Sequence, residues 1–149
     1  MTPTPPLLIG WREMVDLPQL GLVGVKAKID TGARTSALHA ERVRHFDRDG
    51  TPWVRFHVPH AGLEDAFDCE APLVDQREIK NTTGVPEERL VIKTRLRLGG
   101  RLWGIEVSLA DRAAMVMPII LGRTAIRRHN ILVSPGRSWL QHHPAITDR

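Results

Sequence analysis

The sequence contains few cysteine and aromatic residues. Among its 149 residues there are one cysteine, Cys69, no tyrosine, three phenylalanines and four tryptophans. A single cysteine cannot form a disulfide bond within the chain, which is typical of proteins from a reducing compartment. No apolar run is long enough to cross a membrane, and the first residues, Met1 to Pro6, are proline-rich without basic side chains. We therefore expect no signal peptide, no membrane span and a cytoplasmic location.

Common motifs for nucleotides and metals are also missing. There is no Gly-x-x-x-x-Gly-Lys-Ser/Thr loop, and the pair Gly99-Gly100 does not precede a helix that could hold a phosphate. There is no His-Glu-x-x-His or Cys-x-x-Cys pattern either. A zinc site would need side chains that only the fold can bring together, such as His39, His57, His60 and Cys69. We expect no cofactor and no metal.

The charge balance is positive. The chain has 21 Lys and Arg residues against 17 Asp and Glu residues, a net charge of +4, and its pI is near 10.0. This balance favours an acidic partner, either nucleic acid or a glutamate-rich peptide. The basic residues are scattered and match no known nucleic-acid-binding motif, so we expect no nucleic acid and interpret most of these charges as a solvated surface.

Short apolar stretches predict a mostly β protein with one or two short helices. Strands are expected at residues 7–11, 20–29, 43–46, 52–58, 67–73, 91–98 and 102–109. Asp49-Gly50 and Gly99-Gly100 predict tight turns, and a short helix is expected to start with Thr124 as its N-cap. The length suits one domain, which we place at residues 9–140 between flexible tails at 1–8 and 141–149.

One predicted strand ends in a loop of distinct chemistry. Val23, Val25, Ala27 and Ile29 alternate with smaller or charged residues, as in a half-buried strand, and the chain then reads Asp30-Thr31-Gly32-Ala33. Gly32 allows a tight turn with peptide N–H groups directed at the Asp30 carboxylate, and the Thr31 hydroxyl can add a hydrogen bond. An ordinary Asp-Gly-type turn, or a purely structural carboxylate, is the alternative interpretation.

A second segment, Met117 to Arg123, is a short apolar run that ends in Gly122-Arg123. Asp-Thr-Gly-Ala followed by Ile-Leu-Gly-Arg about ninety residues later resembles the retropepsin-like aspartic peptidases. The resemblance implies a closed β-barrel in which the apolar strand packs beside the Asp loop and a short helix follows. It also implies that Asp30, Thr31 and Gly32 are catalytic and that Gly122 and Arg123 support them, with Arg123 forming ion pairs that tie the helix and the dimer contacts.

The similarity covers the chain from about Ile9 to Leu140. The matching segments are Lys28 to Ala40, Arg77 to Gly84, Ser108 to Arg112 and Met117 to Arg123. They resemble the bacterial family labelled ATP-dependent zinc protease, whose members are associated with ATP-grasp glutamate ligases that modify a ribosomal protein. The resemblance implies a peptide or protein substrate, such as a poly-glutamate tail, and an ATP-grasp ligase as partner. Any ATP requirement would belong to that partner, and Asp111-Arg112 has no assigned chemical task.

The polar segment Val74 to Gly84 marks a surface loop when read alone. In retropepsins a flap from this part of the chain closes over the substrate and excludes water from the reacting bond. By that resemblance Ala33, Arg77 and Lys80 would contact the substrate, and two cations would suit an acidic peptide. The alternative is that both cations are solvated loop charges.

One Asp loop per chain supplies half of an aspartic peptidase site. Two adjacent carboxyl groups share a proton, so that one acts as the base toward water and the other donates to the peptide carbonyl. We therefore expect a two-fold homodimer with one Asp30 from each subunit at the axis. Two features depart from the family pattern: the terminal segments do not resemble dimer-forming strands, and Ser134 precedes Pro135 where an aspartate is expected.

Three functions follow from these observations. The first is an aspartic-type endopeptidase that uses Asp30 to activate water, acting on acidic, α-glutamate-rich peptides. The second is a non-catalytic peptide-binding module that acts with a glutamate ligase and would tolerate Asp30→Asn. The third is a zinc-dependent peptidase, for which His39, nine residues after Asp30, is the first ligand to consider.

Overall fold

The computed structural model describes residues 5–59, 68–80, 83–111 and 117–141. Its strands are β1 (Leu7–Leu17), β2 (Leu22–Asp30), β3 (Ser36–His39), β4 (Glu41–Arg48), β5 (Thr51–His57), β6 (Cys69–Lys80), β7 (Pro86–Leu98), β8 (Arg101–Ala110), β9 (Ile119–Gly122) and β10 (Ile131–Ser138). Two short helices, η1 (Pro18–Leu20) and α1 (Arg123–Ile126), complete this part of the chain. Predictions for His60 and Arg112, and for the outer residues of both tails, lie outside the described residues.

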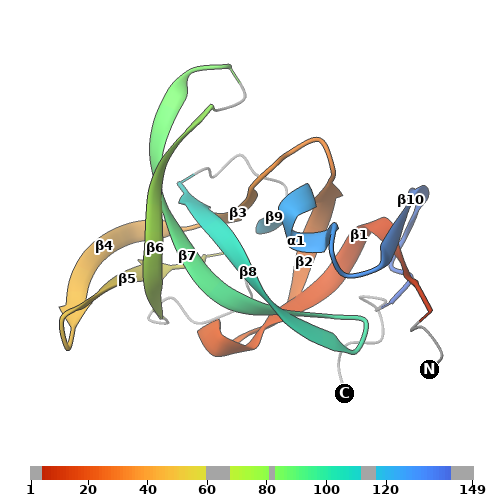
Figure 1. Ribbon diagram of the computed structural model, residues 1–149, viewed down its shortest axis with the longest axis horizontal. Helices are drawn as coiled ribbons and strands as arrows, with labels where there is room; N and C mark the ends of the chain where they lie inside the picture. Colours follow the sequence, from red (N-terminus) through yellow and green to blue (C-terminus); the bar gives the residue numbers. More distant parts are fainter. Residues whose placement is uncertain (1–4, 60–67, 81–82, 112–116, 142–149) are drawn as a thin grey trace.

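The strands form one sheet that closes into a barrel (Figure 1). The strand order is β10-β1-β2-β9-β3-β8-β7-β6-β5-β4, and an additional pairing of Asp16 with Arg97 joins β1 to β7. The closed ring therefore runs β1-β2-β9-β3-β8-β7, with β10 added to β1 and with β6, β5 and β4 extending from β7. The predicted mostly β, retropepsin-like closed barrel with one or two short helices is confirmed.

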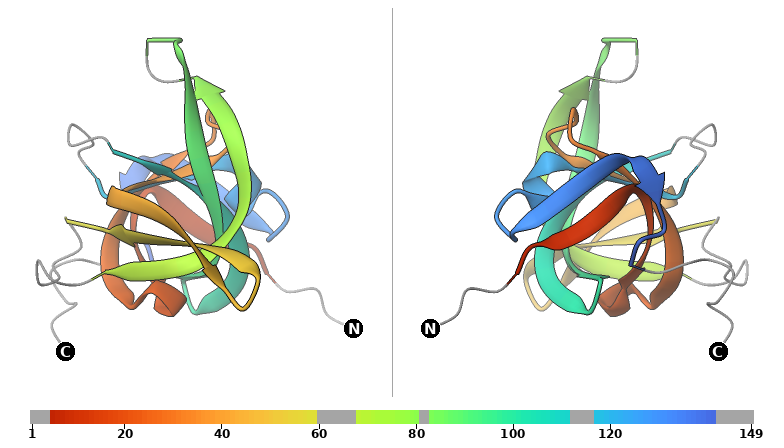
Figure 2. Two further views of the ribbon diagram at one scale, coloured as in Figure 1. Left: turned by 90° about the vertical axis from the view of Figure 1, so that its left-hand side faces the viewer. Right: turned by 90° about the vertical axis from the view of Figure 1, so that its right-hand side faces the viewer.

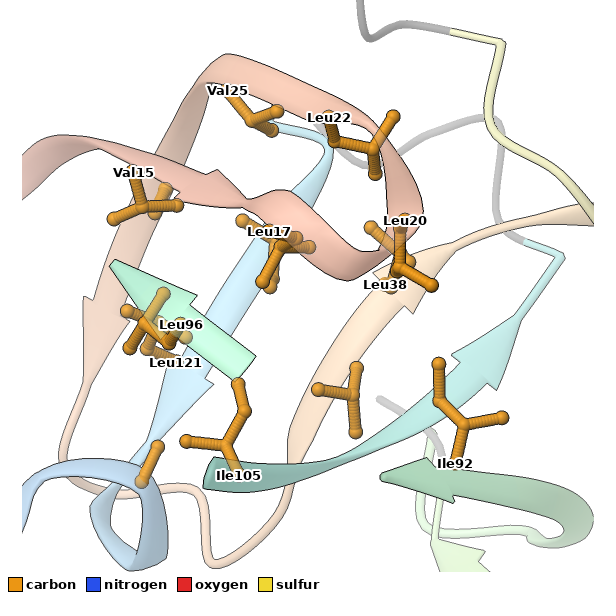
Figure 3. Close-up of a cluster of buried hydrophobic side chains, with 14 of the residues drawn as sticks. Val15, Leu17, Leu20, Leu22, Val25, Leu38, Ile92, Leu96, Ile105 and Leu121 are labelled. Carbon is orange, nitrogen blue, oxygen red and sulfur yellow. The ribbon is translucent and has the colours of Figure 1, made fainter. Parts of the chain in front are cut away.

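Apolar side chains from the strands of the ring fill the barrel (Figure 3). The fully buried members include Leu17, Leu22, Leu38, Leu96 and Leu121. Each is contributed by a different strand, so the interior depends on segments from the whole length of the chain. Removing apolar surface from water in this way is the main force that holds such a sheet closed.

The start of β2 differs from the prediction. Leu22 is buried and Val23 is 70% exposed, although Val23 was expected on the buried face. Gly24 has a φ of 66°, and its amide donates to Asp16 Oδ1 at 2.8 Å. A left-handed residue shifts the alternation of a strand, so the buried face runs through Leu22 and then resumes at Val25.

β1 extends further than the apolar pattern indicated, because a charged residue lies inside it. Glu13 is fully buried, and its carboxylate accepts backbone N–H groups from Gly10 at 2.8 Å, Leu140 at 2.9 Å and Gln141 at 3.1 Å. These hydrogen bonds compensate for the lost hydration of the carboxylate. The bonds from Leu140 and Gln141 also attach the end of the described chain to β1. β1 begins at Leu7, two residues before the start of the expected domain at residue 9.

The segment from Val74 onward is a strand and not the surface loop that its polarity predicted. β6 continues to Lys80 and pairs antiparallel with β7, with Arg77 opposite Arg89 and Lys80 opposite Pro86. Figures 1 and 2 show the far end of this hairpin projecting beyond the barrel. Its residues are polar because much of the hairpin is exposed.

β10 lies parallel to β1 at the edge of the sheet. Leu7 is opposite Ile131 and Ile9 is opposite Val133, so the first and last strands of the described chain are neighbours (Figure 2). In the described residues, no helix is long and apolar enough to span a membrane.

Candidate active site

Asp30 is the last residue of β2, at the point where the chain turns into a tight loop. Its Oδ1 accepts the Gly32 amide at 3.1 Å, and its carbonyl oxygen accepts the Ala33 amide at 3.1 Å. The carboxyl residue is partly exposed, and both Thr31 and Gly32 are exposed. The loop is thus held by the backbone amides of Gly32 and Ala33, while the Thr31 side chain faces solvent.

β9 lies between β2 and β3 and forms the floor of this loop. It runs parallel to β2, with Asp30 opposite Gly122, and antiparallel to β3. A chain that leaves β2 for β3 must therefore cross the end of β9. The crossing is fixed by hydrogen bonds from the Arg123 amide to Ala33 O at 2.8 Å and from the Thr124 hydroxyl to Arg34 O at 2.7 Å.

Gly122 is required at the crossing because no side chain would fit there. A Cβ atom on this residue would lie 2.9 Å from the carbonyl oxygens of Ala33 and Arg34 and from the carbonyl carbon of Thr35. Real Cβ atoms essentially never approach backbone atoms this closely. The loop therefore rests directly on the backbone of β9.

Two serines that the sequence analysis did not assign to the site continue this network. The Gly122 amide donates to Ser36 Oγ at 3.0 Å, and the Ser108 hydroxyl donates to Ser36 O at 2.9 Å. Both serines are buried. The sequence signal for this role was Ser36, a polar residue directly after the loop and before Ala37 and Leu38. The hydrogen bonds of the two serines link the loop to β8.

Arg123 and Thr124 begin α1, and Thr124 is not the N-cap that the sequence predicted. The N-cap is Gly122 and no side chain caps the helix, because the Thr124 hydroxyl is bound to Arg34 O. The Arg123 side chain is exposed, and its Nη1 donates to Gly32 O at 3.2 Å. Within the described residues Arg123 therefore supports the loop through a carbonyl oxygen rather than a carboxylate.

Arg77 and Lys80 come from the projecting hairpin and not from the Asp30 loop. Arg77 Nε lies 2.6 Å from Asp75 Oδ2, and Arg77 Nη2 lies 2.6 Å from Glu106 Oε1. The hydrogen bonds that Arg77 donates to these two carboxylates raise the pKa of Arg77, and the same bond to Asp75 lowers the pKa of Asp75. The charge of Arg77 is thus compensated within the chain, whereas Lys80 is exposed near the end of β6.

The side chains considered for zinc have different surroundings. Cys69 is buried, and its thiol donates to Leu20 O at 3.5 Å; burial, with a smaller effect of Asp68, raises its pKa to about 12. His57 Nδ1 lies 3.9 Å from Asp68 Oδ1. Among the described residues, the metal-type cluster is a different one, made of His39, Glu41 and Asp111.

A surface hollow of about 1080 Å³ lies elsewhere, between η1 and strands β4 to β8. Trp53, Cys69 and Thr94 are among its lining residues, and none of the residues that line it belongs to the Asp30 loop.

A closed barrel with an Asp-Thr-Gly-Ala loop crossing a Gly-terminated strand defines the class of retropepsin-like proteins. The sequence model of the RimB-like family, described as "Retropepsin-like aspartic endopeptidase RimB", matches residues 8–144. The chain belongs to this family.

The curated relatives carry a different kind of name. Proteins named "Probable alpha-L-glutamate ligase" from Desulfotalea psychrophila and Shewanella pealeana are each 40% identical to the chain, over 121 and 134 residues. These alignments cover 80% and 89% of the chain, but only 26% and 29% of the relatives. The chain therefore spans less than a third of the length of these relatives.

A solved structure has the same fold. The crystal structure of a Legionella pneumophila protein of unknown function matches with a TM-score of 0.77 and 28% identity. The match covers 91% of this chain and 98% of that one. The same fold therefore also occurs in the crystal structure of that protein.

Proposed function

We propose that the protein is an aspartic-type endopeptidase in which Asp30, with Thr31 and Gly32, activates a water molecule for attack on a peptide bond. The observation that carries the proposal is the position of Asp30. Its carboxylate lies at the end of β2, partly exposed, in a loop that is fixed from below by Gly122 and β9. A catalytic carboxyl group needs this combination of access and fixed orientation.

The site is completed by a second copy of the chain. One loop supplies one carboxyl group, whereas proton sharing between two carboxyl groups creates the acid and the base that the reaction needs. A two-fold axis beside the exposed residues Thr31 and Gly32 would bring two Asp30 side chains together. The charged Asp30 then takes a proton from water, and the neutral one donates a proton to the carbonyl oxygen of the substrate.

The proposed substrate is an acidic, α-glutamate-rich peptide, such as a poly-glutamate tail. The net charge of +4 favours such a substrate. Ala33 belongs to the loop, and Arg34 is an exposed cation next to it. On the hairpin, Lys80 is the better candidate for binding substrate carboxylates, because the charge of Arg77 is already paired with Asp75 and Glu106.

Hydrolysis of two peptides tests the proposal. Wild type, Asp30→Asn and the control Asp47→Asn, which changes an exposed carboxylate near the end of β4, are incubated with an α-linked oligo-glutamate and with a neutral peptide. Products are identified by mass spectrometry, and circular dichroism verifies the fold. We expect wild type and Asp47→Asn to cleave the acidic peptide and Asp30→Asn to cleave neither. Equal cleavage by Asp30→Asn would refute the aspartic mechanism.

A second candidate function is a non-catalytic peptide-binding module that acts with an ATP-grasp glutamate ligase. The names of the curated relatives, of which this chain matches just over a quarter, favour it. This function predicts binding of oligo-glutamate without cleavage and equal affinity of wild type and Asp30→Asn. Fluorescence anisotropy of a labelled oligo-glutamate, run alongside the cleavage assay, distinguishes the two functions.

A further inference from the structure

The parallel strands β3 and β8 end at the same edge of the barrel and bring three potential metal ligands together. Their register pairs Ser36 with Val107 and His39 with Ala110. The next residues continue the alignment, since the Ala40 amide donates to Ala110 O at 3.0 Å. Asp111 follows directly after β8, and Glu41 begins β4. The three side chains therefore come from three segments that meet at one point.

The ligand atoms of His39, Glu41 and Asp111 all lie within 4.8 Å of one another. His39 Nε2 is 3.9 Å from Glu41 Oε2. In a tetrahedral zinc site with bonds of about 2.0–2.2 Å, ligand atoms are roughly 3.3–3.6 Å apart. Small side-chain movements of the two carboxylates would therefore bring all three atoms to bonding distance, without any change of the strands.

His39 is held in the orientation that a metal ligand requires. Its residue is 1% exposed, and Nδ1 lies 3.2 Å from Ala110 O. A carbonyl oxygen can only accept, so Nδ1 donates to Ala110 O, and Nε2 is the ring atom that faces Glu41. A histidine ligand commonly has its second nitrogen fixed by such a backbone carbonyl.

The two carboxylates are more accessible than the histidine. Glu41 is partly exposed, and Asp111 is exposed. A metal ion can therefore enter from solvent, with the buried imidazole as the inner ligand and the carboxylates as the outer ones. Two carboxylates and one neutral imidazole carry a net charge of −2, which a divalent cation would neutralise.

We propose that His39, Glu41 and Asp111 bind one Zn²⁺ ion that stabilises the junction of β3, β4 and β8 and is separate from the Asp30 site. Imidazole favours zinc over magnesium or calcium, and zinc exceeds manganese in affinity for nitrogen and oxygen ligands. Asp30 lies before the start of β3, and His39 is its last residue. The length of β3, about 10 Å from Ser36 to His39, therefore separates the zinc site from the Asp30 loop. The ion therefore contributes to stability and not to the attack on a peptide bond.

Zinc titration of the full chain without an affinity tag tests this site. The protein is freed of metal with a chelator, and Zn²⁺ binding is measured by competition with a chromogenic chelator, together with the melting temperature. We expect one Zn²⁺ per chain and a rise in melting temperature on binding. Mg²⁺ and Ca²⁺ at the same concentration should give no such rise.

Variants locate the site. Glu41→Gln and Asp111→Asn change accessible side chains, so both should fold, and each should weaken Zn²⁺ binding at least tenfold and remove the rise in melting temperature. Asp47→Asn, which changes an exposed carboxylate near the end of β4, should bind Zn²⁺ as wild type does. Asp30→Asn should also bind normally, whether or not the protein proves to be a peptidase.

Three results would overturn the proposal. Absence of Zn²⁺ uptake by wild type would show that His39, Glu41 and Asp111 form only a local ion-pair group. Unchanged affinity in both Glu41→Gln and Asp111→Asn would place the zinc at other residues. Loss of Zn²⁺ binding in Asp30→Asn would place it at the loop and contradict the separation of the two sites.

Discussion

The contact between the Asp30 loop and Gly122 makes Gly122→Ala a sharp test of the site. Three backbone atoms lie 2.9 Å from the position of the new Cβ atom, whereas ordinary van der Waals contact begins at 3.4 Å. Each of the three contacts must therefore lengthen by about 0.5 Å. All three belong to the backbone of Ala33, Arg34 and Thr35, so a side-chain rotation cannot relieve them.

The added methyl group of Gly122→Ala overpacks a well-packed region, and overpacking lowers the free energy of unfolding by about 1–3 kcal/mol. Because three backbone contacts are shortened at once, we expect a loss near the upper end of this range, about 2–3 kcal/mol. For a chain of this size that cost lowers the melting temperature by roughly 5–10 °C. The loop must also move away from β9, so we expect the proposed hydrolysis to fall at least tenfold.

Urea unfolding measured by circular dichroism gives the stability, and the oligo-glutamate assay gives the activity. Gly136→Ala is the matched control, because a Cβ atom at Gly136 meets no atom within 4 Å. It should leave stability unchanged or raise it slightly. Equal stability of Gly122→Ala and Gly136→Ala would refute the conclusion that the loop rests on the backbone of β9.

Three further predictions concern other parts of the molecule. Lys80→Gln should raise KM for oligo-glutamate about two- to fivefold, whereas Arg77→Gln should change it little, since Arg77 is paired with Asp75 and Glu106. Glu13→Gln should lower the free energy of unfolding by about 2 kcal/mol, because an amide cannot replace a carboxylate that accepts three backbone N–H groups. The high pKa of Cys69, about 12 against an ordinary 9.0, keeps the thiol protonated in the folded state while the unfolded chain ionises. The free energy of unfolding should therefore fall as the pH rises from about 9 toward 12, by up to about 1.4 kcal/mol per pH unit.

Each of these has a control. A neutral peptide should show no KM change for Lys80→Gln, and an equal rise in KM for both peptides would contradict a role in charge recognition. Glu78→Gln, on the exposed hairpin, should alter stability by less than about 0.5 kcal/mol. Cys69→Ala should lack the component of the pH dependence that ionisation of the thiol causes, and identical curves for both proteins would show that this thiol is not the cause.

The sequence predicts the fold well where one rule applies to each residue. The alternation of Val25, Ala27 and Ile29 with lysines identifies β2, because one face packs in the core and the other is solvated. The two motifs around Asp30 and Gly122 then identify the barrel, since a loop and a Gly-terminated strand in this order are specific to few folds.

The same rules fail where tertiary contacts replace local preference. Glu13 lies beyond the strand predicted at residues 7–11, yet it is buried within β1 because distant backbone amides at Leu140 and Gln141 reach its carboxylate. The sequence from Val74 to Lys80 is polar like a loop, yet pairing with β7 satisfies the hydrogen bonds of its backbone. Thr124 looks like an N-cap, but its hydroxyl binds Arg34 O from the other side of the crossing.

The candidate site and its surroundings could likewise be predicted only in part. The presence of Asp30, Gly32 and Gly122 in one loop region follows from motifs, but the pairing of Arg77 with Glu106 depends on the registers of β6 with β7 and of β7 with β8. The meeting of His39 with Asp111 depends on the parallel pairing of β3 with β8, residues more than seventy positions apart. Such long-range register cannot be deduced from the local pattern.

The position of β9 between β2 and β3 also determines when the site can form during synthesis. A ribosome must add about ninety more residues after Asp30 before Gly122 exists, and until then β2 and β3 lack the strand that separates them. Non-local pairings of this kind are slow to form because a long intervening chain must first be closed into a loop. The nascent chain therefore carries the Asp30 carboxylate long before the strand that holds this carboxylate in place has been made.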